Sequence, residues 1–180
     1  MDDIVKQAMA KWPNVPHCYG WLGLDARGNW YMRDEQAQAL GGFASGIAGA
    51  KGSLLQHAKL IEFIQRNYAA DDSGQWYFQN GPQRVYVELE ATPWVWRISD
   101  DLRITAHDST PVEWRLSLVD QRGWLYCETN LGFGLVHTQD VSIAADAIEA
   151  GLWALAETQH LQLPQRYAYI TSPQSLQAGK

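Results

Sequence analysis

Residues 25–31 read DARGNWY, and the same pattern returns at 71–77 as DDSGQWY and at 120–126 as DQRGWLY. Each copy begins with Asp, has Gly three residues later and ends in Tyr after a large, β-preferring residue. Asp can bond back to the nearby backbone, Gly supplies the positive φ that closes a tight turn, and aromatic residues suit a pleated face. Each copy therefore predicts a β-hairpin or a strand–turn–strand corner. Together they predict a fold assembled from similar hairpins.

The composition is that of an ordinary folded protein. The chain has 180 residues, 46% of them hydrophobic and 19% charged, so it can bury a substantial core without metal or disulfide staples. Nine residues are Trp, and side chains this large build either an aromatic core or a binding face. A carbohydrate-binding or base-stacking surface is one interpretation. Most of the Trp residues lie in alternating, strand-like runs, which favours core packing.

Charge and cysteine content narrow the class of protein. The net charge is −6 and no Lys/Arg cluster occurs, which argues against a nucleic-acid partner. Residues 1–12 lack the apolar run of a signal peptide, and residues 39–50 are too short and too Gly-rich to cross a bilayer. Cys18 and Cys127 are expected to be free and buried rather than paired. We therefore expect a soluble, cytoplasmic protein without a membrane partner.

Periodicity predicts the elements. Apolar residues at helical spacing predict a helix over residues 2–11, and a capping box at Ser53 and Gln56 predicts another that ends near Arg66. Asn80-Gly81 predicts a two-residue hairpin turn. Alternation predicts strands at 21–24, 30–33, 76–78, 84–90, 94–98, 102–106, 112–118, 126–128 and 133–137. The C-terminal expectations are a helix at 143–150 closed by Gly151, strands at 153–157 and 167–170, and a frayed tail after Pro173.

These elements predict an α+β fold, predominantly antiparallel β, in which hairpins build a barrel or sandwich-like sheet with two or three short helices. Residues 1–50 are expected to form a helix and hairpin unit, and residues 51–180 a helix and main β unit, unless both form one compact domain. The Gly-rich segment 41–52 (GGFASGIAGAKG) is the expected linker. It lacks the spacing of a phosphate-binding P-loop.

Catalytic motifs are weak in this chain. No metal-ligand spacing and no Gly-x-Ser-x-Gly elbow occurs, so no catalytic residue, metal or cofactor is assigned. Cys127 with His137 could form a nucleophile–base pair across the third hairpin, although a buried structural thiol explains Cys127 as well. Glu88 with Glu90 could supply paired carboxylates, or simply a solvated strand face.

The predicted hairpin at residues 76–86 is the candidate ligand site. It combines aromatic rings with amide and guanidinium groups, which suits a planar or carboxylate-bearing ligand or a peptide. The candidate residues are Trp76, Tyr77, Gln79, Asn80, Gln83, Arg84 and Tyr86. The alternative is that Asn80-Gly81 only makes the turn and that Arg84 pairs with Glu88 or Asp72.

Three stretches resemble an uncharacterised proteobacterial family of about this length, a domain of unknown function. They are residues 12–30, residues 63–87, which contain the specific phrase FQNGPQRVYV, and residues 145–153. The Gly-rich segment 41–52 departs from the resemblance. The resemblance implies a compact cytoplasmic bacterial protein, and no catalytic residue, cofactor or partner comes with it.

The absence of a catalytic motif and the surplus of aromatic and amide side chains favour a non-enzymatic binding or regulatory module. One alternative is a small hydrolase-type enzyme that uses Cys127 and His137 or Glu88 and Glu90. A second is a structural homodimer subunit joined through an exposed edge strand.

Overall fold

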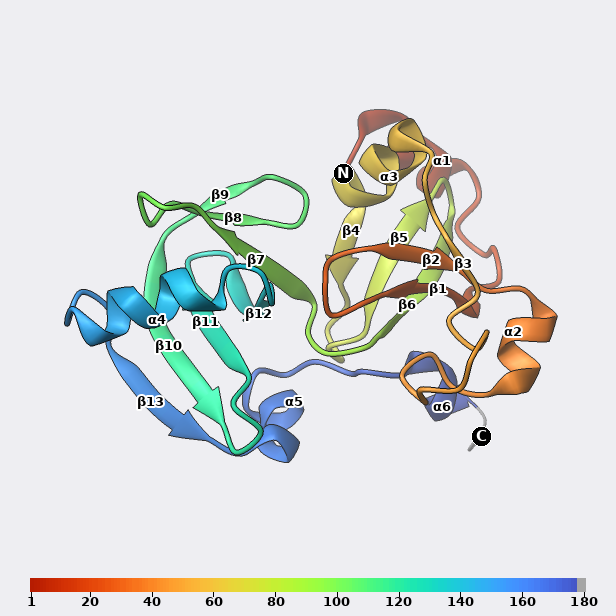
Figure 1. The fold of residues 1–180 in the computed structure, drawn as a ribbon. Coiled ribbons are helices and arrows are strands. Elements are labelled where there is room, and N and C mark those ends of the chain that lie inside the picture. Colours follow the sequence, from red (N-terminus) through yellow and green to blue (C-terminus); the bar gives the residue numbers. More distant parts are fainter. Residues whose placement is uncertain (178–180) are drawn as a thin grey trace. The chain divides into compact units, whose positions relative to one another are not determined.

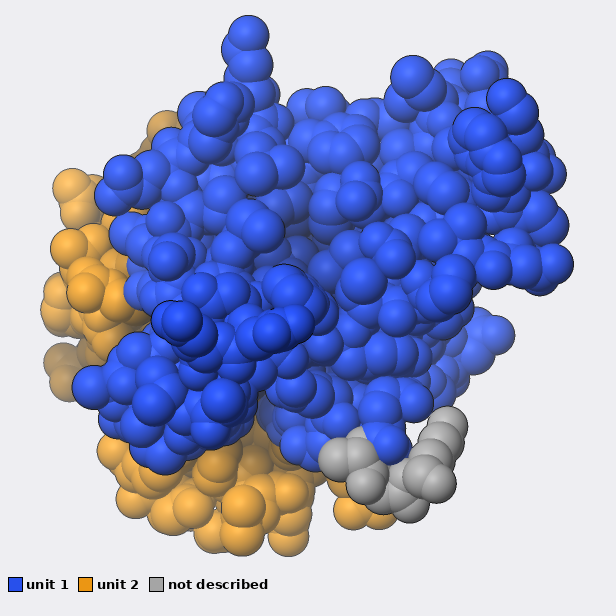
Figure 2. Space-filling view, turned by 90° about the vertical axis from the view of Figure 1, so that its right-hand side faces the viewer, with its two compact units in different colours: residues 1–25, 29–90, 169–180 blue, residues 26–28, 91–168 orange. Residues whose placement is uncertain are grey.

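The computed structural model describes residues 1–177 and is an α+β fold with two mixed β-sheets and several short helices (Figure 1). The chain divides into two compact units, which Figure 2 distinguishes by colour. Unit 1 contains residues 1–25, 29–90 and the C-terminal segment from Tyr169, and unit 2 contains residues 26–28 and 91–168. Within residues 1–177, no helix has both the length and the apolar character needed to cross a bilayer.

Unit 1 is built on a six-stranded sheet in the order β3-β2-β1-β6-β5-β4. All neighbours are antiparallel except the central pair, in which β1 runs parallel to β6. The strands are β1 (Cys18–Leu24), β2 (Trp30–Met32), β3 (Ser53–Leu54), β4 (Tyr68–Ala70), β5 (Trp76–Asn80) and β6 (Gln83–Leu89). The helices are α1 (Asp3–Lys11), α2 (Glu35–Leu40), α3 (Ala58–Arg66) and α6 (Pro173–Gln177). Residues from before and after position 50 therefore share one sheet.

Unit 2 is built on a seven-stranded sheet in the order β13-β10-β11-β12-β7-β8-β9, and two of its neighbouring pairs, β10 with β13 and β12 with β7, are parallel. The strands are β7 (Trp94–Ile98), β8 (Ile104–Ala106), β9 (Pro111–Val112), β10 (Trp114–Asp120), β11 (Leu125–Thr129), β12 (Gly132–Val136) and β13 (Leu155–Thr158). The helical segments are α4 (Val141–Glu149), a 3₁₀ turn (His160–Gln162) and α5 (Leu163–Arg166). Both sheets keep two edge strands, so neither closes into a barrel.

The three repeated segments all form the predicted hairpin turn. In each, the first Asp donates its backbone NH to the carbonyl of the fifth residue, at 3.0, 2.9 and 3.0 Å for Asp25, Asp71 and Asp120. The same carboxylate accepts the NH of that fifth residue, at 2.8, 2.9 and 3.0 Å. The fourth residue is Gly with φ of 83°, 81° and 78°. Each is thus a three-residue hairpin loop closed by a left-handed residue, a common connection between antiparallel strands.

Two further turns share this geometry without the Asp–Gly signature. Ser99 donates its NH to the carbonyl of Arg103 at 3.0 Å, and Ala106 donates to Thr110 at 2.8 Å. Their fourth residues, Leu102 and Ser109, have φ of 61° and 69°. Five hairpins therefore use one turn, and two of them place a residue with a side chain where the other three have Gly.

The helix predicted to end near Arg66 is α3, which is shorter than predicted, and the capping box predicted at Ser53 is wrong. Ser53 lies in β3, paired with Met32, and the helix begins only at Ala58. Its N-cap is His57, whose Nδ1 accepts the NH of Leu60 at 3.3 Å. A strand pairing formed by distant residues outweighs the local capping preference.

Three other local predictions are also corrected. The central residues of the β5–β6 turn are Gly81 and Pro82, since Asn80 pairs with Gln83 and Gly81 has φ of 57°. Residues 167–170 do not form a strand. Residues 173–177 of the expected frayed tail form α6, and the rest of that tail lies outside the described residues.

The Gly-rich segment 41–52 is held in place by a buried arginine. Arg33 is 1% exposed. Its guanidinium donates to the carbonyl oxygens of Gly20, Gly41 and Ala50 at 3.2, 2.5 and 2.8 Å. The segment is thus an ordered loop inside unit 1, because a guanidinium can satisfy several carbonyl groups that helices and strands leave free.

Candidate functional site

The seven predicted ligand residues lie on the β5–β6 hairpin but do not converge on one site. Tyr77 pairs with Tyr86 and Gln79 with Arg84, so these four share one face of the sheet. Since side chains alternate along a strand, the other three candidates, Trp76, Asn80 and Gln83, belong to the opposite face. The hairpin therefore contributes to two separate environments.

In the first environment the aromatic rings and the Arg84 guanidinium contact one another, and the buried Gln79 Oε1 has no hydrogen-bond partner among the described residues. The Arg84 guanidinium lies 4.4 Å from the centre of the Tyr77 ring, and the Tyr86 ring stacks on Tyr19 at 4.6 Å. The Tyr86 hydroxyl donates to Asp71 Oδ2 at 3.1 Å, and burial raises the pKa of that tyrosine. Tyr77 and Tyr86 are both buried. The aromatic rings of this face contact one another, Arg84 and Asp71, so these side chains stabilise the sheet of unit 1.

The second environment is an apolar groove between α3 and the sheet of unit 1. It encloses a cavity of about 280 Å³. Leu22, Ile64 and Phe78 are buried at its base. Its other lining residues are Cys18, Trp21, Met32, Leu55, Leu60, Phe63, Asn80 and Val85.

A bulge in β1 shapes the mouth of this groove. Cys18 pairs with Val85 and Leu22 with Val87, so three residues of β1 oppose one residue of β6. The middle one, Gly20, has φ of 81°, and a Cβ there would come within 2.4 Å of the neighbouring Gln174 side chain. Bulges re-aim side chains, and this one brings Trp21 to the groove. Trp21 is 42% exposed.

Two polar side chains line the groove. The Cys18 thiol is free and partly exposed. The Asn80 side chain is exposed and has no hydrogen-bond partner among residues 1–177. The remaining lining is apolar, so the groove can desolvate an apolar group and offer its polar end an amide.

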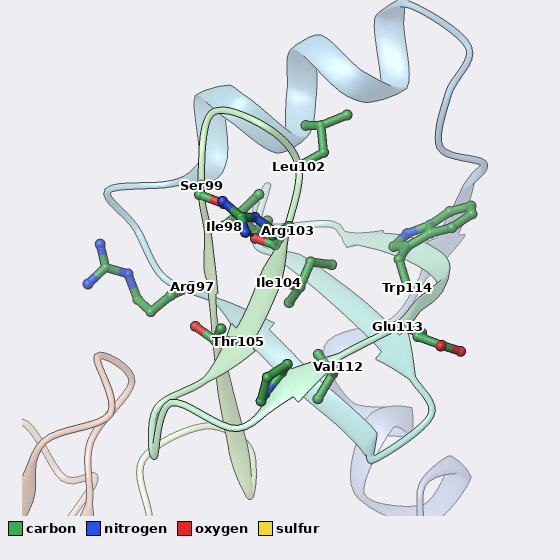
Figure 3. Close-up of a pocket in the computed structure, with 11 residues that line it drawn as sticks. Arg97, Ile98, Ser99, Leu102, Arg103, Ile104, Thr105, Val112, Glu113 and Trp114 are labelled. Atoms are coloured by element: carbon green, nitrogen blue, oxygen red, sulfur yellow. Dashed lines mark hydrogen bonds between the residues drawn. The ribbon is translucent and has the colours of Figure 1, made fainter.

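Unit 2 contains a larger pocket, of about 680 Å³, between the β7–β8 hairpin, β9 and the start of β10 (Figure 3). Figure 3 shows Leu102 and Ile104 extending toward the side on which Trp114 lies, whereas Arg97 points away. The other lining residues are Ile98, Ser99, Arg103, Thr105, Pro111 and Glu113.

The hydrolase alternatives lack reactive geometry. Cys127 is 0% exposed, and burial raises its pKa to about 12, so it stays a thiol at neutral pH. The neighbour of its Sγ is Ser117 Oγ at 3.7 Å, and His137 Nδ1 accepts the NH of Gln139 at 3.1 Å.

The two glutamates of the paired-carboxylate alternative are also engaged elsewhere. Glu88 accepts the Ser172 hydroxyl at 2.5 Å and the Gln174 NH at 2.9 Å. Glu90 accepts Lys51 Nζ at 2.7 Å. Within residues 1–177, no cluster of three or more His, Cys, Asp or Glu side chains is placed to hold a metal ion.

Sequence reasoning missed Trp21, Met32, Leu102 and Trp114. Trp21 and Met32 look like ordinary strand residues, and only the bulge and the helix opposite them create a groove. Leu102 could have been noticed, because the run from Ser99 to Arg103 has the length of the three repeated turns but Leu where they have Gly.

Comparison with known proteins agrees with the resemblance noted from the sequence. No curated protein matches the chain. Among solved structures, it is similar to the crystal structure of a DUF1285 family protein from Silicibacter pomeroyi DSS-3, with 12% sequence identity and a TM-score of 0.47 over 81% of this chain and 84% of that chain. A likeness this distant carries no functional information. The family model DUF2944, described as "Protein of unknown function (DUF2946)", matches residues 1–177, and the chain belongs to this family.

Proposed function

We propose that this protein is a non-enzymatic binding module that takes a linear apolar group, such as a medium-length acyl chain, into the groove of unit 1. The observation that carries the proposal is the open apolar groove itself, in which Trp21 and Met32 are 42% and 50% exposed. Leaving large apolar side chains in water forgoes roughly 25 cal/mol for each Å² that could be buried. A ligand that covers them recovers this free energy.

The size and lining of the groove favour a chain-like ligand. Its volume of about 280 Å³ lies just below the usual range for drug-sized ligands, which begins at about 300 Å³. Its base is formed by aliphatic and Phe side chains without charge. An uncharged groove penalises a charged or strongly polar group placed inside it, since each buried polar group would need a hydrogen-bond partner. The chain of the ligand therefore belongs in the groove and its polar end outside the apolar base.

Asn80 supplies the polar end of the proposed site. It lies at the end of β5 beside the groove, and its amide can both donate to and accept from a ligand head group. In this form the proposal keeps Asn80 from the sequence-based candidates and assigns the buried Tyr77 and Tyr86 to the fold. The two free cysteines fit a reducing compartment, and cytoplasmic residence is part of the proposal.

Cys18 gives a direct test, because its thiol lines the groove. The rate at which the native protein reacts with 5,5′-dithiobis(2-nitrobenzoate) reports access to Cys18, since Cys127 is fully buried. Decanoate at one hundred times its dissociation constant should slow this reaction about 100-fold, because only the unoccupied fraction reacts. Acetate, which has the same carboxylate without the chain, should leave the rate unchanged. Equal rates with and without decanoate would refute the proposal.

A pair of tryptophan variants locates the binding. Trp21→Ala should weaken decanoate binding at least several-fold, because Trp21 forms the mouth of the groove. Trp12→Ala is the matched control, since Trp12 is 51% exposed in the same unit but does not line the groove. Equal loss of affinity in both variants would mean that decanoate binds elsewhere.

A further inference from the structure

We propose that the pocket of unit 2 is a second, independent binding site, for a flat and largely apolar ring ligand that lies between Leu102 and the Trp114 indole. The pocket volume of about 680 Å³ falls within the range of small-molecule sites, roughly 300–1,000 Å³. The site shares no residue with the groove of unit 1, so either site can fail without the other.

Trp114 forms a rigid wall of this pocket. Its Nε1–H donates to Ser117 Oγ at 3.0 Å, which fixes the orientation of the ring. The Trp153 ring stacks against it with centroids 5.6 Å apart and planes 9° apart. An indole held in this way loses little freedom when a ligand stacks on it, and aromatic faces prefer flat partners in offset stacking.

Leu102 forms the opposite part of the rim in a conformation that is costly for it. Its φ of 61° lies in the left-handed region, where Cβ crowds the following carbonyl oxygen. The turn is held by the Leu102 NH, which donates to Ser99 O at 2.8 Å, and by the Ser99 hydroxyl, which donates to Asp101 Oδ1 at 2.6 Å. These two hydrogen bonds hold Leu102 in its left-handed conformation.

The other hairpins show that this strain is not required by the turn. The equivalent positions in the three repeated segments are Gly28, Gly74 and Gly123, all with positive φ. Gly would close the Ser99–Arg103 turn without strain. A leucine in its place adds an apolar side chain, and that side chain lines the pocket. Ser109 is the other residue that keeps this strain, but it is polar, exposed and outside the pocket, whereas Leu102 is a large apolar residue that lines it. The cost of the strained leucine points to a role for its side chain.

Apolar surface below the rim completes the site. Ile98 and Ile104 are buried and Val112 is half-buried, and all three line the pocket. The nearby guanidinium groups are neutralised, since Arg97 donates to Asp140 at 2.6 Å and Arg103 pairs with Asp101. An uncharged ring therefore fits this pocket better than a multiply charged ligand.

The probe is N-phenyl-1-naphthylamine, an uncharged ring compound whose fluorescence rises in apolar sites. Titration of the full chain should show saturable binding. Trp114→Leu keeps an apolar side chain but removes the ring, and should weaken probe binding at least about 10-fold. Because this change also removes the stack on Trp153, a second variant is needed that spares the fold.

Leu102→Gly is that variant. It should weaken probe binding at least about 5-fold and leave the melting temperature within a few degrees of the parent, since relief of backbone strain offsets the lost side-chain contacts. Ser109→Gly is the matched control, because Ser109 occupies the same turn position with φ of 69° but does not line the pocket. It should keep full probe affinity.

Three results would overturn the proposal. One is unchanged probe affinity in Leu102→Gly. Another is a large fall in the melting temperature of that variant, which would make Leu102 a packing residue. The third is probe fluorescence that never saturates. If decanoate fails to slow the reaction of Cys18, the result refutes the proposed function of the groove in unit 1 and leaves this second site untouched.

Discussion

The Tyr126 hydroxyl donates a 2.9 Å hydrogen bond to Asp120 Oδ2, which links the last residue of the third repeated segment to its first. Arg122 also donates to Oδ2, at 2.9 Å through Nη2, and the Asp120 side chain is fully buried. Burial alone would raise the pKa of Asp120, but these hydrogen bonds and the NH of Trp124 lower it. Asp120 and Tyr126 therefore stabilise the same hairpin turn through a direct hydrogen bond.

Removing the Tyr126 hydroxyl should destabilise this hairpin. Tyr126→Phe leaves the ring stacked on Phe133 but deprives the buried Asp120 of one donor. We expect a loss of about 1–2 kcal/mol, seen as a fall of roughly 3–6 °C in the melting temperature. Tyr19→Phe is the control, since the Tyr19 ring stacks on Tyr86 and its hydroxyl has no partner among residues 1–177. Equal melting temperatures for Tyr126→Phe and the parent would contradict the prediction.

Arg33 should control the order of residues 41–52. Arg33→Lys replaces a planar group with five N–H donors by an ammonium that cannot reach the carbonyl oxygens of Gly20, Gly41 and Ala50 together. We expect a loss of about 2–3 kcal/mol, because buried carbonyl groups lose their donors. Limited proteolysis should cut the variant faster within this segment. An unchanged cleavage pattern would mean that the segment is held by other contacts.

Two glycines with the same φ should respond very differently to substitution by Ala. Gly123 and Gly52 both have φ of 78°. A Cβ at Gly123 meets no atom within 4 Å, so Gly123→Ala should cost only the backbone strain, about 1–2 kcal/mol. A Cβ at Gly52 would lie 2.2 Å from the Met32 carbonyl oxygen, so Gly52→Ala must displace β2 and should cost considerably more. Urea denaturation of both variants measures the difference, and similar midpoints would contradict the prediction.

Glu88 should make the protein less stable as the pH rises. Burial raises its pKa above the ordinary 4.5, although Ser172, Gln174 and Arg33 oppose the shift. The folded state then binds more protons than the unfolded state between 4.5 and the raised value, so stability is greatest below that window and falls as pH increases through it. Glu88→Gln removes the charge and keeps an acceptor for the Gln174 NH.

This variant should therefore show a flatter dependence of the melting temperature on pH above 4.5, and at pH 7 it should be at least as stable as the parent. Glu90→Gln is the control for an amide at a half-buried position of the same unit. The prediction is contradicted if the melting temperature of the parent rises as the pH increases from 4.5 and this rise is absent in Glu88→Gln.

Local sequence determined the three hairpins that begin with Asp. In the three Asp-x-x-Gly segments the interacting groups lie within five residues of one another, so the turn forms from Asp hydrogen bonding and the positive φ of Gly wherever it occurs. The same local logic predicted α1 and the helix closed by Gly151. It also predicted the α+β class, because alternation and helical spacing are properties of short windows.

Tertiary structure decided the rest, because the deciding partners are far apart in the chain. Ser53 pairs with Met32 in the sheet and does not cap a helix. The Gly-rich segment is ordered because Arg33 donates hydrogen bonds to its carbonyl groups. The parallel pairing of β1 with β6 and the bulge that brings Trp21 to the groove join residues more than sixty positions apart. The sequence by itself thus determined the three Asp-x-x-Gly turns, α1 and the helix closed by Gly151. Only the assembled sheets decided which face of each hairpin meets an open groove, because exposure depends on what packs opposite a residue rather than on its neighbours in sequence.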